Sequence, residues 1–343
     1  MKQIDLSYRP DIGTYRPDID GLRALAVMSV VLFHVFPSVF RGGFVGVDIF
    51  FVISGYLITS HIYQSFSDGT WSLIGFFGRR IRRLFPALIV VTLSSLLFGW
   101  LVLLPDEFAQ LGKHLAHSAA FIVNFTFAEE VGYFDNAAET KPLLHLWSLA
   151  VEEQFYIFWP LALLIFKSRY LASLIATIFV FAISVLFASG LFDVDQTSSF
   201  FWPFGRFWEL LSGAALAWFF VYVGERRRFV AGLLPQFPVF SNRFLANPPT
   251  FRWTDFFSVI GVALICLSCF FFDKDLRWPS FWTIAPVLGA CLLIMAGKNS
   301  LVSRVIFTNR VATFVGLISY PLYLWHWPLL SYLRIIYDPS VRQ

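Results

Sequence analysis

The stretch RALAVMSVVLFH, residues 23–34, places an arginine and a histidine at the two ends of ten residues that all suit lipid. Eleven steps of about 100° bring Arg23 and His34 to within about 20° of one helical face, roughly 16 Å apart along the axis. Ionisable side chains at membrane depth are costly and usually mark function. We therefore expect a membrane helix with a functional face. The alternative is a histidine that only packs against a neighbouring helix.

The composition indicates a polytopic membrane protein. Of the 343 residues, 57% are hydrophobic and 14% are charged, and the mean hydropathy is +0.68. A soluble fold with this composition would expose large apolar patches. Residues 1–20 are polar and show no cleavable signal peptide. The pair Cys266 and Cys269 lies inside an apolar run, which favours a helix-packing role over a disulfide or a metal site.

The apolar runs predict an all-α transmembrane helix bundle. Nine of them are long enough to cross roughly 30 Å of hydrocarbon. A tenth candidate, 108–127, carries Lys113, His114 and His117, and we interpret it as an amphipathic interfacial or re-entrant segment. His114 and His117 lack a third ligand in the sequence, so we expect no metal there. The nine predicted spans are 20–40, 44–63, 84–104, 147–166, 171–190, 204–223, 254–272, 281–297 and 311–332.

The distribution of positive charge orients these spans. With the N-terminus in the cytoplasm, 18 of the 26 Lys and Arg residues lie on the cytoplasmic side and seven lie outside. This asymmetry follows the positive-inside rule. The charge asymmetry nearly disappears if segment 108–127 also crosses the membrane. We therefore predict a multi-pass protein of a bacterial cytoplasmic (inner) membrane, with membrane lipids as partners and the C-terminus of this chain outside.

A cluster of four arginines stands at the cytoplasmic start of the third predicted span, in GRRIRRLFPAL at 78–88. Forked guanidinium groups on one helix face make a good clamp for phosphates. The alternative is an ordinary topology signal. The cluster consists of Arg79, Arg80, Arg82 and Arg83.

Several further polar side chains are expected in the outer half of the bundle. Adjacent carboxylates point about 100° apart on a helix, so one of Glu152 and Glu153 could orient the imidazole of His34 while the other caps the helix N-terminus. Other candidates for substrate contact lie near the outer helix ends, where an interfacial anchoring role is the alternative for the histidine. These are Asp48, Arg206, Glu209 and His326.

These groups together indicate a phosphate-binding entrance on the cytoplasmic face and an acid/base chamber nearer the outside. A protein that moves an activated group from a cytosolic, phosphate-bearing donor to an external acceptor needs both. No nucleic-acid partner is expected, and the oligomeric state is open.

The chain resembles the acyltransferase family 3 membrane proteins, the group of O-antigen and peptidoglycan O-acetylases. Five motifs carry the resemblance, in the family's order and over most of the chain. They are DGLRALAVMSVVLFH at 20–34, GGFVGVDIFFVISGYLIT at 42–59, RRIRRLFPAL at 79–88, PLLHLWSLAVEEQFYIFWP at 142–160 and ISYPLYLWHWPLL at 318–330.

The resemblance implies transfer of an acyl group, usually acetyl, from acyl-CoA to a hydroxyl of an extracytoplasmic glycan such as O-antigen, with no permanently bound cofactor. It implies an essential His34 in an arginine–ten–histidine motif with Arg23. It also implies a donor-binding pair, either Arg80 and Arg83 or Arg79 and Arg82, and a conserved acidic pair at 152–153. Close relatives add a last helix and an external SGNH hydrolase-like domain. We therefore expect residues 1–343 to be one truncated transmembrane acyltransferase domain.

The mechanism predicted here has His34 as the general base toward the acceptor hydroxyl. A nucleophilic Ser54 and a covalent acyl-histidine are less favoured alternatives. A transporter or flippase without transferase chemistry is the competing class, because it would also place charges inside the bundle. The inverted repeats typical of many transporters are not visible in this sequence. A scaffold for a missing external domain is a third class.

Overall fold

The computed structural model describes residues 15–130, 138–165, 170–188, 200–233, 253–273 and 276–337. All regular structure in these ranges is helical, as the all-α prediction requires. The helices are α1 (Pro17–Val35), α2 (Gly46–Ser67), α3 (Leu73–Val102), α4 (Pro105–Ala119), α5 (Val123–Glu129), α6 (Leu146–Ile165), α7 (Tyr170–Ala188), α9 (Pro203–Leu233), α11 (Trp253–Phe271), α12 (Ile284–Ala296), α13 (Arg310–Leu317) and α14 (Ser319–Tyr337), with short turns η1 (Gly43–Val45), η2 (Ala138–Thr140), η3 (Phe281–Thr283) and η4 (Ser303–Phe307).

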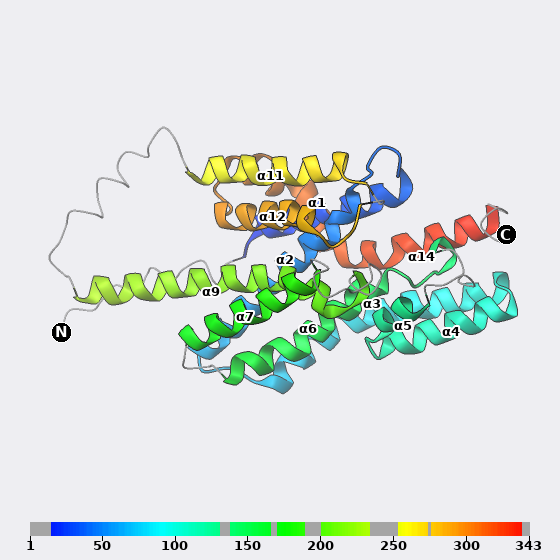
Figure 1. Cartoon of the computed structure of the whole chain (residues 1–343), viewed down its shortest axis with the longest axis horizontal. Helices are drawn as coiled ribbons and strands as arrows, with labels where there is room; N and C mark the ends of the chain where they lie inside the picture. The colour runs from blue at the N-terminus through cyan, green and yellow to red at the C-terminus, as the bar shows by residue number, and fades with distance from the viewer. Residues whose placement is uncertain are drawn as a thin grey trace.

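Helix α2 is the central element of the bundle. Figure 1 shows α1, α11 and α12 on one side of it and α3, α6 and α7 on the other, with α9 running alongside. Phe51 and Ile58 of α2 belong to a core shared with α3 and α6. Ile49 and Val52 of α2 belong to a second core shared with α1, α11 and α12. An apolar helix with buried residues on all sides is expected at the centre of a bundle.

Helix α3 faces outward. Its apolar residues Leu93, Leu97, Trp100 and Leu101 are all more than half exposed. In water such a surface would be a large sticky patch, whereas in a bilayer it contacts lipid at no cost. This exposure supports the membrane setting predicted from composition.

The nine-span count is not confirmed. Each predicted span contains a helix, but only four helical segments among the described residues are long and apolar enough to cross a membrane. Helix α1 fails this criterion because Asp18, Asp20 and Arg23 all lie within it. The four are Gly43–Ser67, Leu73–Val102, Leu146–Ile165 and Trp253–Phe271.

Two predicted segments differ in detail from the structure. The predicted span 311–332 is not one continuous helix, because the chain divides at Ile318 into α13 and α14. The division follows Gly316, where the backbone approaches Asp20 of α1 so closely that a Cβ would lie 1.9 Å from the Asp20 carbonyl oxygen. Segment 108–127 forms α4 and α5 with a turn at Phe121, where φ is +54°. Its amphipathic character is clear from the buried side of α4, formed by Leu111, His114 and Ser118.

The contact between α2 and α9 depends on two glycines. A Cβ built on Gly55 would lie 1.8 Å from the carbonyl oxygen of Leu210, and one on Gly213 would lie 2.0 Å from that of Val52. We predict that Gly55→Ala lowers the free energy of unfolding by about 1–3 kcal/mol, because the helices must separate.

The matched control is Gly78→Ala in α3, where no atom of the described residues lies within 4 Å of the added methyl group. Thermal unfolding in detergent should show a lower Tm for the Gly55 variant and an unchanged or higher Tm for the control, since alanine is the better helix former. Equal Tm values for the two variants would contradict the close packing of α2 on α9.

Candidate active site

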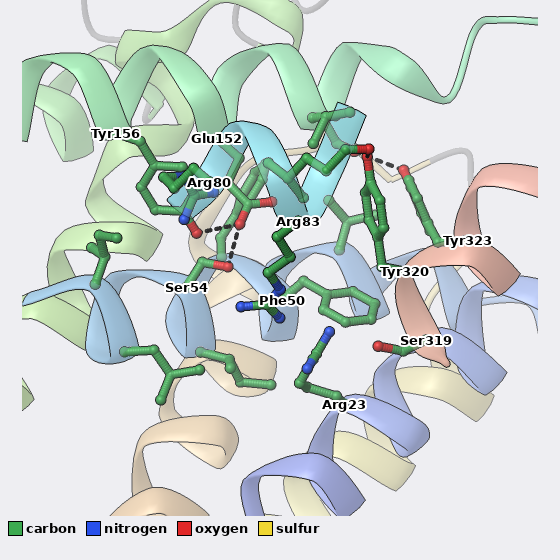
Figure 2. A pocket seen from close by; sticks show the side chains of 18 of the residues that line it. Arg23, Phe50, Ser54, Arg80, Arg83, Glu152, Tyr156, Ser319, Tyr320 and Tyr323 are labelled. Atoms are coloured by element: carbon green, nitrogen blue, oxygen red, sulfur yellow. Dashed lines mark hydrogen bonds between the residues drawn. The ribbon is translucent and has the colours of Figure 1, made fainter. Parts of the chain in front are cut away.

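An inner cavity of about 160 Å³ opens among α1, α2, α3, α6 and α14. Figure 2 shows that its labelled side chains come from all five helices and include both cations and hydroxyl groups. The residues that matter below are Arg23, Ser54, Arg80, Arg83, Ser148, Glu152, Tyr156 and Tyr323.

The arginines of the cavity fall into two kinds. Arg80 donates to Glu153 at 2.7 Å and stacks 3.4 Å above the ring of Tyr156, so its charge is compensated. Arg23 is paired less closely, with 3.6 Å between its Nη1 and Oδ1 of Asp20. Arg83 has no ion pair among the described residues. Arg23 and Arg83 point toward one another across the cavity (Figure 2). Two weakly compensated guanidinium groups on one cavity favour an anionic ligand.

The structure distinguishes the two arginine pairs that the sequence left open. Arg80 and Arg83 line the inner cavity, whereas Arg79 and Arg82 do not, although Arg83 is exposed at the surface like those two. The predicted four-arginine clamp is therefore reduced to one face of α3.

The two predicted acidic residues bind other partners than His34. Glu152 accepts hydrogen bonds from Ser54 at 2.5 Å and from Tyr156, and Glu153 pairs with Arg80. The expectation that one of these carboxylates orients the His34 ring is thus not met in the described part of the chain. Both carboxylates instead organise the inner cavity.

A second imidazole contacts His34. Nδ1 of His326 lies 2.5 Å from the carbonyl oxygen of Tyr323, and because a carbonyl only accepts, this nitrogen carries the proton. In a neutral imidazole Nε2 of His326 is then an acceptor. Its neighbour at 3.2 Å, Nδ1 of His34, must donate. Nε2 of His34 consequently keeps its lone pair, which is the state required of a base.

His34 lies between two further cavities. A middle cavity of about 160 Å³ is lined by His34, His145 and Arg206, and it shares Val47 and Tyr323 with the inner cavity. An outer cavity of about 410 Å³ also includes His34 and carries Arg41, Glu139, Asp273, Trp327 and Arg334. The three cavities form a row in which Tyr323 separates the first two and His34 borders the last two.

Arg206, Asp48 and Glu209 form a buried ionic group. Arg206 Nη2 is 2.6 Å from Asp48 Oδ1, and Nη1 is 3.1 Å from Glu209 Oε1, with all three side chains at most 1% exposed. The indole Nε1–H of Trp278 donates a further hydrogen bond to Asp48 Oδ1 at 3.3 Å. Of these predicted substrate contacts, only Arg206 lines a described cavity.

A second ionic cluster, around Glu130, lies outside the membrane-spanning helices. It is linked through Lys141 to a wall of the middle and outer cavities. Burial alone would raise the pKa of Glu130, but the hydrogen bond from His114 and the charge of Lys141 lower it to about 2. The Lys141 carbonyl accepts from Trp327, a wall of the middle and outer cavities. His117 bonds separately to Thr126, and no group of three or more metal-ligating side chains occurs within the described ranges.

Sequence reasoning did not assign functional roles to several cavity residues. Tyr156 was not singled out, although it lies one turn after Glu152. No local sequence pattern marks Tyr323, because its position between two cavities depends on how α14 packs on α1. His145, seven residues before Glu152, is another cavity residue without an assigned role. Its position in an otherwise apolar run, LLHLW, was the available signal.

A bundle of apolar helices around a row of cavities, each with a few ionisable side chains in a mainly apolar lining, defines a helical membrane protein with an internal site. The comparison with known proteins agrees: residues 16–342 match the acyltransferase family 3 profile, described as an acyltransferase domain. The chain belongs to this family.

Three relatives illustrate the relationship. A Staphylococcus aureus (strain MSSA476) protein named "Putative O-acetyltransferase" is 32% identical over 335 residues, covering 94% of this chain and 52% of its own. "Putative peptidoglycan O-acetyltransferase YrhL" of Bacillus subtilis (strain 168) is 33% identical over 330 residues, covering 92% and 49%. Peptidoglycan O-acetyltransferase OatA of Listeria monocytogenes serovar 1/2a (strain ATCC BAA-679 / EGD-e) is 31% identical over 335 residues, covering 92% and 50%. The chain spans about half the length of these relatives. No solved structure matches it.

The ionic group around Arg206 gives a stability prediction. Arg206→Ala should lower the free energy of unfolding by about 3–5 kcal/mol, because it leaves Asp48 and Glu209 buried without their cation. Thermal unfolding in detergent measures the loss, with Arg82→Ala as an exposed-arginine control. A Tm for the Arg206 variant equal to that of the control would show that the group contributes nothing to folding.

Proposed function

We propose that this chain is the membrane part of an O-acetyltransferase, moving an acetyl group from cytoplasmic acetyl-CoA to a hydroxyl of an extracytoplasmic glycan. The observation that carries the proposal is the row of three cavities, with Arg23 and Arg83 on the first and the lone pair of His34 between the last two. The family and the names of the relatives support the reaction class.

Acetyl-CoA is held at its phosphate-bearing nucleotide end by charge and along its pantetheine arm by the shape of the cavity. Arg23 and Arg83 bind the phosphates of coenzyme A through charge-assisted hydrogen bonds, while Arg80 stays paired with Glu153. The inner cavity holds only about 160 Å³, below the roughly 300 Å³ of a typical ligand pocket. It therefore suits the narrow pantetheine arm, while the nucleotide stays at the arginine rim. The thioester reaches the middle cavity past Tyr323.

His34 is the general base for the transfer. Its Nε2 takes the proton of the acceptor hydroxyl as the hydroxyl oxygen attacks the thioester carbonyl carbon. The carbon–sulfur bond breaks, the new ester forms, and the proton passes to the leaving thiolate to give free coenzyme A. The hydroxyl of Ser54 donates its hydrogen bond to Glu152 and has no imidazole partner among its described contacts. Ser54 is therefore not the nucleophile in this scheme.

The acceptor enters from the outer cavity. This cavity is lined by Trp327 and by the polar groups of Glu139, Asp273 and Arg334. The resemblance suggested O-antigen, but the relatives named for an acceptor are named for peptidoglycan. A peptidoglycan-type glycan is accordingly the acceptor we propose. The positive-inside pattern supports placing the arginine rim at the cytoplasmic face of the cell membrane.

Labelled acetyl-CoA outside inside-out vesicles, with an oligosaccharide of peptidoglycan type trapped in the lumen, tests the proposal. Transfer yields a labelled, base-labile ester on the oligosaccharide and one free coenzyme A thiol for each ester. A transporter would instead deliver label to the lumen without ester, and that result would refute the transferase.

Donor binding can be separated from folding by two arginine variants on one helix. Arg83→Ala should raise the KM for acetyl-CoA about tenfold or more, because a charge-assisted bond to phosphate is lost. Arg82→Ala removes an equal charge one residue away, outside the cavity, and should leave the KM nearly unchanged. Equal effects of the two substitutions would refute the assignment of the inner cavity to the donor.

The base is tested by His34→Gln, which keeps a polar side chain of similar size without a titratable nitrogen. The rate of transfer should fall about 10²–10⁴-fold with little change in the KM for acetyl-CoA. Initial rates over a range of donor concentrations provide both constants. Transfer at the wild-type rate would eliminate His34 as the base.

A further inference from the structure

His145 is a buried histidine that the scheme above does not use. Its side chain lines the middle cavity and is only 4% exposed. The ring faces the backbone carbonyl of Leu324 without reaching it in normal hydrogen-bond geometry, and neither Nδ1 nor Nε2 has another partner among the described residues. A buried imidazole with two unsatisfied nitrogens is unusual, since such groups cost about 1–3 kcal/mol each.

The position of His145 is fixed by its backbone. Its carbonyl oxygen accepts from the hydroxyl of Tyr323 at 3.0 Å and from that of Ser148 at 3.3 Å. The ring centroid lies 5.6 Å from that of Tyr323 and 5.7 Å from that of His326. His145 therefore sits immediately beyond the Tyr323 partition, on the side of His34.

The chemistry of the middle cavity suggests which ligand atom the ring meets. A neutral imidazole has one N–H donor and one acceptor. The acceptor hydroxyl donates to His34 in the proposed reaction, so the other reacting atom that needs a partner is the thioester carbonyl oxygen. This oxygen gains negative charge in the transition state, where a preorganised donor is most effective. A thioester passing Tyr323 enters the cavity that His145 lines, with the two rings 5.6 Å apart.

We propose that His145 donates a ring N–H to the carbonyl oxygen of the donor thioester, making it a second catalytic imidazole opposite His34. The inference rests on the proposed function, because it takes acyl-CoA as the donor. His145 keeps its proton throughout. The proton of the hydroxyl still passes through His34 to the leaving thiolate, so the reaction balances as before.

Two acetyl-CoA analogues test the contact without turnover. In S-ethyl-CoA a methylene replaces the carbonyl, and in the ketone analogue a methylene replaces the sulfur while the carbonyl stays in place. Calorimetry on the purified chain in detergent should give a Kd about fivefold lower for the ketone than for S-ethyl-CoA, the effect of one net hydrogen bond. His145→Phe should abolish this preference, and His145→Gln, which retains an N–H donor, should keep part of it.

The control is His117→Ala, a histidine bonded to Thr126 away from the cavities, which should retain the full preference. A ketone preference that survives His145→Phe overturns the proposal, and so does a wild-type chain that binds both analogues equally. Failure to bind either analogue overturns the donor site itself and this inference with it. Normal binding without transfer overturns the transferase but not the His145 contact.

Kinetics provide a second readout that a purely structural role would not produce. His145→Phe should lower kcat about 10²–10³-fold with the KM for acetyl-CoA little changed, as for loss of one oxyanion donor. His145→Gln should restore part of kcat. A rise in KM at unchanged kcat would place His145 in ground-state binding only and contradict the proposal.

Discussion

The contact between His34 and His326 is the constraint on which the site depends. It joins α1 to α14 across 292 residues of sequence, and the Tyr323 carbonyl determines which nitrogen carries each proton. Arg334 of α14 reinforces the same contact by donating to the His34 carbonyl at 2.8 Å. Because α14 also supplies Tyr323 and Trp327, the same packing that orients the base also builds the partition and the outer wall.

The structure separates charges that hold the bundle together from charges left for a ligand. Arg80 and Arg206 are each compensated by buried carboxylates, which offsets the cost of placing them among apolar helices. Within the described ranges Arg23 and Arg83 lack compensation of this quality, and both lie at the inner cavity. Together with His34 and His145, they are the cavity-lining groups to which the proposed reaction assigns a ligand atom.

Much of the fold and some of the site could be predicted from the sequence. Apolar run length predicted the helices, and the spacing of Arg23 and His34 correctly put them in one helix, because both depend on local periodicity. The choice between arginine pairs depended on which face of α3 packs inward. The partners of His34 and Glu152 lie far away in sequence, so the carboxylate–imidazole prediction had no local information to correct it. The close approach of α13 to α1 at Gly316, just before the break at Ile318, is likewise a long-range contact.

The central claim is that the histidine pair leaves Nε2 of His34 unprotonated and available. Nitrogen-15 NMR of histidine-labelled protein in detergent at neutral pH reports the tautomer directly, with His34 assigned by the signals lost in His34→Gln. The account predicts a neutral ring protonated at Nδ1 with a free Nε2. A ring protonated at Nε2, or at both nitrogens, would contradict it.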